Sequence, residues 1–236
     1  MNHWKLASLS ALSILLGNGA AHADVARYAS THCNDAGITC WEVQKGETWE
    51  TLWPEATERD LAMRVNRMNI RLRPGMIAAV PSSKDSGEGA AFQPFPAQID
   101  PPGEKQIWID LENLAWGAFD AEGRLLKWGP ASGGKDWCPD IDQPCQTPAG
   151  EYSVSRKGRA GCKSGKFPIP TGGAPMPYCM YFHGGYAIHG SPEVPGYRAS
   201  HGCVRVFPED ARWLNDEFVE LPNAEEGTSG TKVLIR

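Results

Sequence analysis

Seven cysteines constrain this 236-residue chain more than any other feature. They are Cys33, Cys40, Cys138, Cys145, Cys162, Cys179 and Cys203. In an oxidising compartment six of them can pair, and the odd one leaves a free thiol that calls for an explanation. Proximity along the chain favours three short loops, although six cysteines allow many other pairings. The favoured loops are closed by Cys33–Cys40, Cys138–Cys145 and Cys162–Cys179, which leaves Cys203 unpaired.

The first residues predict export. Lys5 precedes a mostly apolar stretch from Leu6 to Leu16, and Ala21-His22-Ala23 has the small-x-small pattern that signal peptidase recognises. A membrane-spanning helix needs about 20 consecutive apolar residues, so residues 1–23 are interpreted as a cleaved signal peptide and not as an anchor. Cys33 lies too far behind the apolar stretch to carry a lipid anchor. We therefore expect an exported protein of the periplasm or cell envelope, without stable membrane insertion.

Charge and residue spacing argue against several classes of partner. The formal net charge is −5, which gives no basis for binding nucleic acid. No CxxC or HExxH spacing occurs, and His189, His201 and Cys203 would be an atypical set of zinc ligands. We therefore expect neither a metal nor an organic cofactor.

Composition divides the exported part into four segments. Residues 24–40 form a short, cysteine-flanked lead-in, and residues 41–81 form a compact block. Residues 82–98 have the Ser, Gly and Pro bias of a linker. Residues 99–236 form the final block.

The block 41–81 is predicted to be a strand-helix-helix-strand (βααβ) unit. The first strand is expected at Glu42 to Gln44, followed by a helix that Thr48 can cap. The apolar spacing from Glu58 to Asn69 predicts the second helix, with Asp60 and Arg64 spaced for a surface ion pair. Met76 to Val80 is expected to be the closing strand.

The final block is predicted to be mainly β with few helices. Asp120 to Gly123 is expected to be a hairpin turn. Pro208 to Phe218 is expected to be a helix, because proline suits the first turn and the acidic residues behind it favour the positive helix end. Alternating apolar residues predict the strands Gln106–Leu111, Leu114–Phe119, Arg124–Trp128, Glu151–Ser155, Met180–Phe182, Tyr186–His189, Val204–Phe207 and Thr231–Ile235.

Cys203 lies near two histidines that could activate it. A thiol becomes a strong nucleophile only as thiolate, and an unperturbed cysteine has a pKa of about 8.5. If the chain around Gly202 is extended, His201 and Cys203 share one face, whereas a strand pairing would bring His189 opposite Cys203. The residues alone do not decide which imidazole meets the sulfur. Gly202 would let backbone N–H groups approach a reacting carbonyl. The alternative is a buried structural thiol.

These motifs resemble the signature of the L,D-transpeptidase (YkuD-type) catalytic domain. Its core matches Ile188-His189-Gly190 and Ser200-His201-Gly202-Cys203-Val204-Arg205, and Thr147-Pro148-Ala149-Gly150 resembles that family's entry into a strand. Gly129 to Gly134 and Met176 to Tyr178 also fit. The resemblance spans residues 99–236 and implies a YkuD-like β-sandwich. The loop between His189 and Ser200 is shorter than in many members, which bears on substrate preference.

The resemblance also implies roles for single residues. Cys203 would be the nucleophile and His189 the base, with the carbonyl of Gly190 orienting the ring. The amides of Gly202 and Cys203 would form an oxyanion hole. Further residues would support the site or bind substrate: His201, Ser200, Arg205 and Tyr181.

The block 41–81 resembles LysM, a small peptidoglycan-binding module. The matching residues are Val43, Gly46-Glu47-Thr48, Asn66 or Asn69, Leu72, Pro74-Gly75, and Ile77 to Val80 with Pro81. The resemblance implies binding to glycan strands of the wall, and the alternative is a spacer that kept the fold without sugar affinity. Trp49 and Trp53 would either stack on sugar rings or be buried.

Together, the two resemblances imply a peptidoglycan L,D-transpeptidase. Cys203 would form a thioester with a stem peptide and release its terminal D-alanine. An amine of a second stem, giving a 3-3 crosslink, or of an envelope protein would then take the acyl group. Two alternatives are an L,D-carboxypeptidase or amide hydrolase that uses the same Cys/His site, and a binding module without catalysis.

Overall fold

The structure is a computed structural model of the chain. It describes residues 27–33, 35, 37–81, 92–225 and 227–236. The predicted signal peptide, residues 1–23, lies outside the described residues, as do residues 82–91 of the predicted linker. Within the described ranges, no helix combines the length and apolar character that crossing a bilayer requires.

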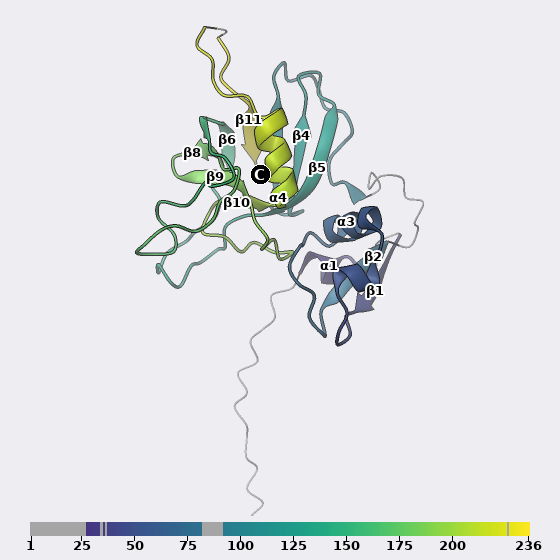
Figure 1. Ribbon diagram of the computed structural model, residues 1–236. Helices are drawn as coiled ribbons and strands as arrows, with labels where there is room; N and C mark the ends of the chain where they lie inside the picture. The colour runs from purple at the N-terminus through teal and green to yellow at the C-terminus, as the bar shows by residue number, and fades with distance from the viewer. Residues whose placement is uncertain (1–26, 34, 36, 82–91, 226) are drawn as a thin grey trace, which may run out of the picture.

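A nine-stranded sheet forms the centre of the molecule, in the order β6, β11, β3, β4, β5, β10, β9, β8, β7 (Figure 1). Two neighbouring pairs are parallel, β11 with β3 and β9 with β10, and the others are antiparallel. The strands are β3 (Gln106–Asp110), β4 (Ala115–Phe119), β5 (Leu125–Ser132), β6 (Gly150–Ser153), β7 (Arg156–Lys157), β8 (Met180–His183), β9 (Tyr186–Gly190), β10 (Val204–Val206) and β11 (Lys232–Ile235). The expectation of a mainly β fold is confirmed.

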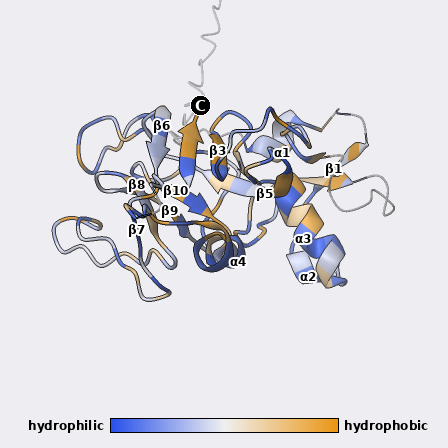
Figure 2. Ribbon diagram, turned by 90° about the horizontal axis from the view of Figure 1, so that it is seen from above, coloured by the Kyte–Doolittle hydropathy of each residue, from blue (hydrophilic) through white to orange (hydrophobic). Residues whose placement is uncertain are grey.

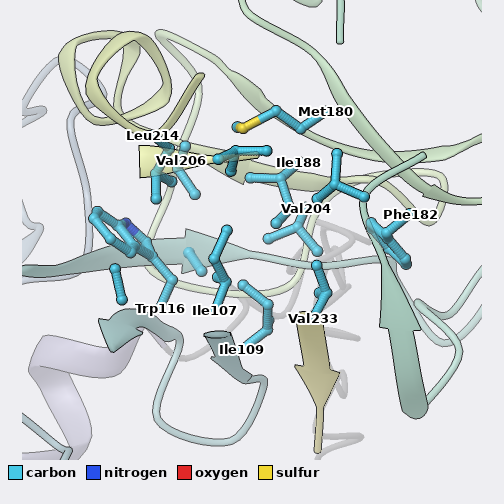
Figure 3. Close-up of a cluster of buried hydrophobic side chains, with 14 of the residues drawn as sticks. Ile107, Ile109, Trp116, Met180, Phe182, Ile188, Val204, Val206, Leu214 and Val233 are labelled. Atoms are coloured by element: carbon cyan, nitrogen blue, oxygen red, sulfur yellow. The ribbon is translucent and has the colours of Figure 1, made fainter. Parts of the chain in front are cut away.

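The sheet curls around one main core, in which apolar side chains from both halves meet (Figure 3). Trp116, Ile107 and Ile109 come from the first half, and Ile188 and Val204 come from the second; all five are fully buried. Burying side chains of this size contributes about 1.5 to 3 kcal/mol each. Ile188 on β9 and Val204 on β10 therefore anchor the strands of the Cys/His motifs in the core.

The structure lengthens one predicted strand and divides the predicted C-terminal helix. β5 continues past Trp128 to Ser132, because its second half pairs with β10 as well as with β4. The helix α4 (Pro208–Trp213) begins with proline in its first turn, as predicted, and then widens into the π-helix η2 (Leu214–Phe218). α4 follows directly on β10 and packs against β9.

The N-terminal block begins with the short helix α1 (Tyr28–Thr31) and continues as strand, helix, helix and strand. Its elements are β1 (Ile38–Glu42), α2 (Trp49–Leu52), α3 (Ala56–Val65) and β2 (Ile77–Pro81). β1 lies earlier than the predicted strand Glu42 to Gln44, because the residues that pair with β2 run from Ile38, opposite Pro81, to Glu42, opposite Ile77. α3 ends before the predicted Asn69, because Arg67 has a φ of 53°, in the left-handed region. Thr48 caps α2, as predicted, in a capping box with Thr51.

Trp49 and Trp53 are both buried in the core of this block, and the indole Nε1 of Trp49 donates to the carbonyl of Ile70 at 2.8 Å. Burial removes these rings from contact with a glycan, which decides between the two alternatives for them. The exposed indole of the block is Trp41, which is 45% exposed and donates to Glu47.

The N-terminal block packs against the large domain on the side of β5, away from β6 and β8 (Figures 1 and 2). Arg64 pairs with Asp60 at 2.7 Å, as its spacing predicted; the Asp60 side chain lies at the surface, but that of Arg64 is largely buried. Its guanidinium also forms two hydrogen bonds of 2.9 Å with the buried carboxylate of Asp210 on α4. A bidentate pair of this kind fixes orientation as well as distance.

The three predicted disulfides are confirmed: Cys33–Cys40, Cys138–Cys145 and Cys162–Cys179. Cys203 is the one free cysteine of the seven. The last two bridges close the loops that contain Ile141 and Ser164, and both of these residues line a cavity with Cys203.

Candidate active site

β9 and β10 carry the two predicted motifs side by side. The strands are parallel and His189 is the register partner of Arg205, so the expectation that His189 lies opposite Cys203 was wrong by two positions. Side chains two positions apart in a strand share a face. His189 and Cys203 accordingly line the same cavity of about 300 Å³.

His189 is buried and neutral. Its ring Nδ1 lies 2.9 Å from the carbonyl of Gly190, which assigns the proton to Nδ1 and leaves Nε2 as an acceptor. Burial lowers the pKa of His189 to about 4, and the Gly190 hydrogen bond offsets only part of that shift. The imidazole can therefore accept a proton at neutral pH.

Cys203 lies directly before β10, partly buried. Its thiol faces the carbonyl of Gly185, with the sulfur 3.9 Å from the oxygen. Burial raises the pKa of Cys203, against smaller lowering effects from the Ala187 backbone and from Arg205. The resting site therefore pairs a neutral thiol with a neutral imidazole, and it stores no thiolate.

The chain before Cys203 is a tight bend, so the condition under which His201 and Cys203 would share an extended face is not met. Gly202 has a φ of 116°, and a Cβ there would lie 2.4 Å from the ring of Tyr186. Ser200 is buried, and its hydroxyl accepts from the Gly202 amide at 3.0 Å and donates to the Cys203 carbonyl. Thr147 donates to the Gly202 carbonyl at 2.8 Å. These bonds brace the bend in one conformation.

His201 is held by a partner that the sequence did not reveal. Its Nε2 lies 2.8 Å from one carboxylate oxygen of Asp140 and 3.0 Å from the other. The imidazole ring also packs on Phe167, with the ring centroids 4.5 Å apart. The pKa of Asp140 is lowered, first by this hydrogen bond. These contacts fit the supporting role that the resemblance implies for His201.

Cys138, Asp140 and His201 lie close enough together to be considered as metal ligands. The Cys138 sulfur, however, is bonded to Cys145 and offers no thiolate to an ion. The donor set that remains, one imidazole and one carboxylate, is small for a structural or catalytic metal site.

A second cavity, of about 480 Å³, is also lined by Cys203. Tyr181 lines it together with Arg156, whose guanidinium lies 3.4 Å from the Tyr181 ring centroid. Arg205 and Ser200 line the smaller cavity. The predicted substrate-binding residues thus line two cavities that share Cys203, Tyr181 the larger one and Ser200 and Arg205 the smaller one.

The two cavities share part of their lining, from a segment for which the sequence predicted no role. Ser164, Phe167 and Met176 line both of them, and this segment is closed by the Cys162–Cys179 bridge. Arg205 is tied to the rim of the smaller cavity, because its Nη1 donates to the carbonyl of Glu193 at 3.2 Å.

The catalytic-domain model of the YkuD family, described as L,D-transpeptidase catalytic domain, matches residues 104–235. Among solved structures, the L,D-transpeptidase of Xylanimonas cellulosilytica is 26% identical, with a TM-score of 0.52, over 75% of this chain and 78% of that one.

Two further solved structures are more distant. An Enterococcus faecium L,D-transpeptidase is 27% identical, with a TM-score of 0.44, over 56% of this chain and 50% of that one. A Mycobacterium smegmatis L,D-transpeptidase is 18% identical, with a TM-score of 0.43, over 69% and 63%. A search of curated proteins found no match.

Proposed function

The chain belongs to the L,D-transpeptidase family with a YkuD catalytic domain, and on that premise we propose that it is a cysteine acyltransferase acting on peptidoglycan stem peptides. One observation carries the proposal. The single free thiol of seven cysteines shares a cavity with a buried, neutral imidazole whose Nδ1 is already hydrogen-bonded. An acceptor nitrogen and a free thiol that line one cavity are the two groups that nucleophilic catalysis by cysteine needs.

In the first step, the Cys203 sulfur attacks the amide carbonyl between the third stem residue, diaminopimelate, and the terminal D-alanine. The sulfur–carbon bond forms while the thiol proton passes to Nε2 of His189. The tetrahedral intermediate then collapses, the carbon–nitrogen bond breaks, and His189 returns the proton to the leaving amine of D-alanine. A thioester on Cys203 is left.

The pKa shifts imply that proton transfer accompanies the attack. Burial raises the pKa of Cys203 and lowers that of His189 to about 4, so both shifts oppose a resting thiolate-imidazolium pair. A bound substrate carbonyl gives the sulfur electrons a destination at the moment the proton leaves.

The Cys203 amide is the first candidate for binding the oxyanion. The Gly202 amide already donates to Ser200, so its implied role as a donor would require that bond to lengthen. The Tyr181 hydroxyl, in the larger cavity, is the candidate for a second donor.

The second step transfers the acyl group from Cys203 to an amine, of a second stem or of an envelope protein. An amine adds to the thioester carbonyl, gives up a proton to His189, and expels the thiolate, which regains the proton. The two adjoining cavities that Cys203 lines offer space for two different peptides. Water in place of the amine would make the protein an L,D-carboxypeptidase or hydrolase.

We further propose that residues 41–81 form a LysM-like module that brings the enzyme to glycan strands in the periplasm or cell envelope. Its strand-helix-helix-strand order supports the proposal. Retention of the purified protein on insoluble peptidoglycan, but not on cellulose, is the expected result of a pull-down.

The decisive experiment incubates the purified protein with a disaccharide-tetrapeptide and follows protein and products by mass spectrometry. We expect an acyl adduct on Cys203, release of D-alanine and a crosslinked dimer. Cys203→Ser should form no thioester adduct. Tripeptide without dimer would identify the hydrolase, and an unmodified protein with unchanged peptide would refute acyl transfer.

A further inference from the structure

The loop between the two catalytic motifs is held by the N-terminal block. Residues 191–199 connect β9, which carries His189, with the bend that carries Cys203. Pro192 and Glu193 are exposed and line the smaller cavity, whereas residues 194–196 are buried. The conformation of this rim therefore depends on the residues that cover its buried part.

Asn69 of the N-terminal block makes three hydrogen bonds to this rim. Its backbone N–H donates to the carbonyl of Val194 at 3.0 Å, and its side-chain oxygen accepts from the Val194 amide at 2.9 Å. Its side-chain nitrogen donates to the carbonyl of Ser191 at 2.9 Å. One asparagine thus satisfies three backbone groups of the rim, and backbone groups in such a place need a partner.

The neighbouring residues extend this contact in both directions. Met68, which is fully buried, forms an isolated antiparallel bridge with Pro195. The backbone N–H of Tyr28 donates to the carbonyl of Gly196 at 2.8 Å. The rim is therefore bound to the N-terminal block at successive positions along its buried part.

Asn66 shows what an asparagine does when it serves the block alone. Its side chain donates to the carbonyls of Ala62 and Ala79 at 2.7 and 2.8 Å and accepts from the Ala79 amide at 2.7 Å. All three bonds stay within the N-terminal block. The side chain of Asn69, three positions later, makes its bonds to the other domain.

Two arginines join the part of the N-terminal block that carries Asn69 to the large domain. Arg64 holds Asp210 on α4 by two hydrogen bonds. Arg67 is buried, with its guanidinium 4.8 Å from the ring centroid of Trp128 on β5, and it donates to the carbonyl of Asn113 at 3.1 Å. The block is thus joined to α4 and to the sheet, so Asn69 has a firm support.

We propose that Asn69 is a positioning residue of the active site, which fixes the Ser191–Val194 rim of the cavity that contains His189 and Cys203. The N-terminal block then belongs to the catalytic unit in addition to any role in wall binding. The proposal rests on the proposed acyl transfer, since the fixed rim is the surface that a stem peptide would meet. Asn69 then affects the binding of the stem peptide and not the reactivity of the Cys203 thiol itself.

The test compares Asn69→Ala with Gln44→Ala in the full chain. Gln44 is an exposed amide of the same block that bonds only within it, to the carbonyl of Glu42. In Asn69→Ala, we expect KM for Cys203 acylation by a tetrapeptide to rise at least about fivefold, the effect of one hydrogen bond. Alkylation of Cys203 by iodoacetamide, which needs no peptide contact, should keep its rate.

Hydrogen exchange gives a readout that does not depend on the reaction. The Val194 amide should exchange faster in Asn69→Ala, while amides of the N-terminal core stay protected. Asn69→Asp, which keeps the acceptor for Val194 and loses the donor to Ser191, should fall between the wild type and Asn69→Ala in both readouts. This variant keeps the test usable if the alanine variant unfolds.

A wild-type KM in Asn69→Ala would overturn the proposal, whether or not exchange at Val194 changes. A wild-type protein that forms no adduct would instead refute the proposed function. The claim that Asn69 holds the rim would then be decided by exchange, with unchanged Val194 protection in Asn69→Ala refuting it and faster exchange supporting it.

Discussion

Nε2 of His201 lies 2.8 Å from a carboxylate oxygen of Asp140, and His201 lines both cavities that contain Cys203. His201 belongs to the bend before Cys203, and Asp140 belongs to the loop that the Cys138–Cys145 disulfide closes. The disulfide loop therefore supplies a side chain that supports the catalytic bend.

Asp140→Asn should lower kcat/KM for acylation about tenfold, the order of effect expected when a charge-assisted hydrogen bond is replaced by a neutral one. The amide is neutral and holds the imidazole less firmly than the carboxylate does. Asp142→Asn is the matched control, because Asp142 is an exposed acid of the same loop. Equal effects of the two substitutions would exclude a specific role for Asp140.

Activity should have an acid limit near pH 4, because His189 must be neutral to accept the thiol proton and its pKa is lowered to about 4. A pH profile of kcat/KM for the free enzyme measures this limit. A limit near the ordinary histidine value of about 6.5 would show that the ring is not desolvated as the structure indicates.

The same shift makes folding stability depend on pH. An unfolded histidine has a pKa of about 6.5, so between that value and about 4 the unfolded state binds more protons than the folded state. Burial of neutral His189 therefore costs no stability above about pH 6.5. As the pH falls from about 6.5 to about 4, the free energy of unfolding decreases by about 3 kcal/mol. His189→Gln should remove this component, as urea unfolding at pH 7 and pH 4 would show.

Thiol labelling should modify one residue in the native protein. Iodoacetamide without a reductant should label Cys203 alone, because the other six cysteines are paired. The rate should still be rising above pH 8.5, since burial raises the Cys203 pKa. Cys203→Ser should take up no label until the protein is reduced, and labelling of another native cysteine would contradict the pairing.

Arg64→Ala should destabilise the fold by about 3 kcal/mol, because among the described residues it leaves the buried Asp210 carboxylate with Lys127, at 3.1 Å, as its one charged partner. Denaturant unfolding measures the loss. Asp60→Asn breaks the exposed side of the same cluster and should cost less than about 1 kcal/mol. Similar losses in the two variants would show that the contact with Asp210 adds nothing.

Local patterns predicted what is local in this fold. The alternation around Ile107 and Ile109 marks β3, the proline at 208 marks the start of α4, and the short spacing from Cys138 to Cys145 marks their disulfide. Each depends on residues a few positions apart. The motif around Cys203 indicated a candidate site for the same reason, because its residues are contiguous.

Contacts between residues far apart in the chain could not be predicted from such local patterns. Asp140 and His201 are 61 positions apart, and Arg64 and Asp210 are 146 positions apart. The register of β9 on β10 was also missed, because two adjacent strands can pair in several registers until the whole sheet is formed. Asn69 matched a module pattern, and nothing near it in the chain indicated that its bonds go to Ser191 and Val194.

The pairing of six sulfurs has a consequence for damage by oxidants. If Cys203 is oxidised to a sulfenic acid, no reduced cysteine of the chain can resolve it into a disulfide. Further oxidation to the sulfinic acid would be irreversible for this protein. Its working lifetime would then depend on a reductant from outside the molecule, and not on any repair within it.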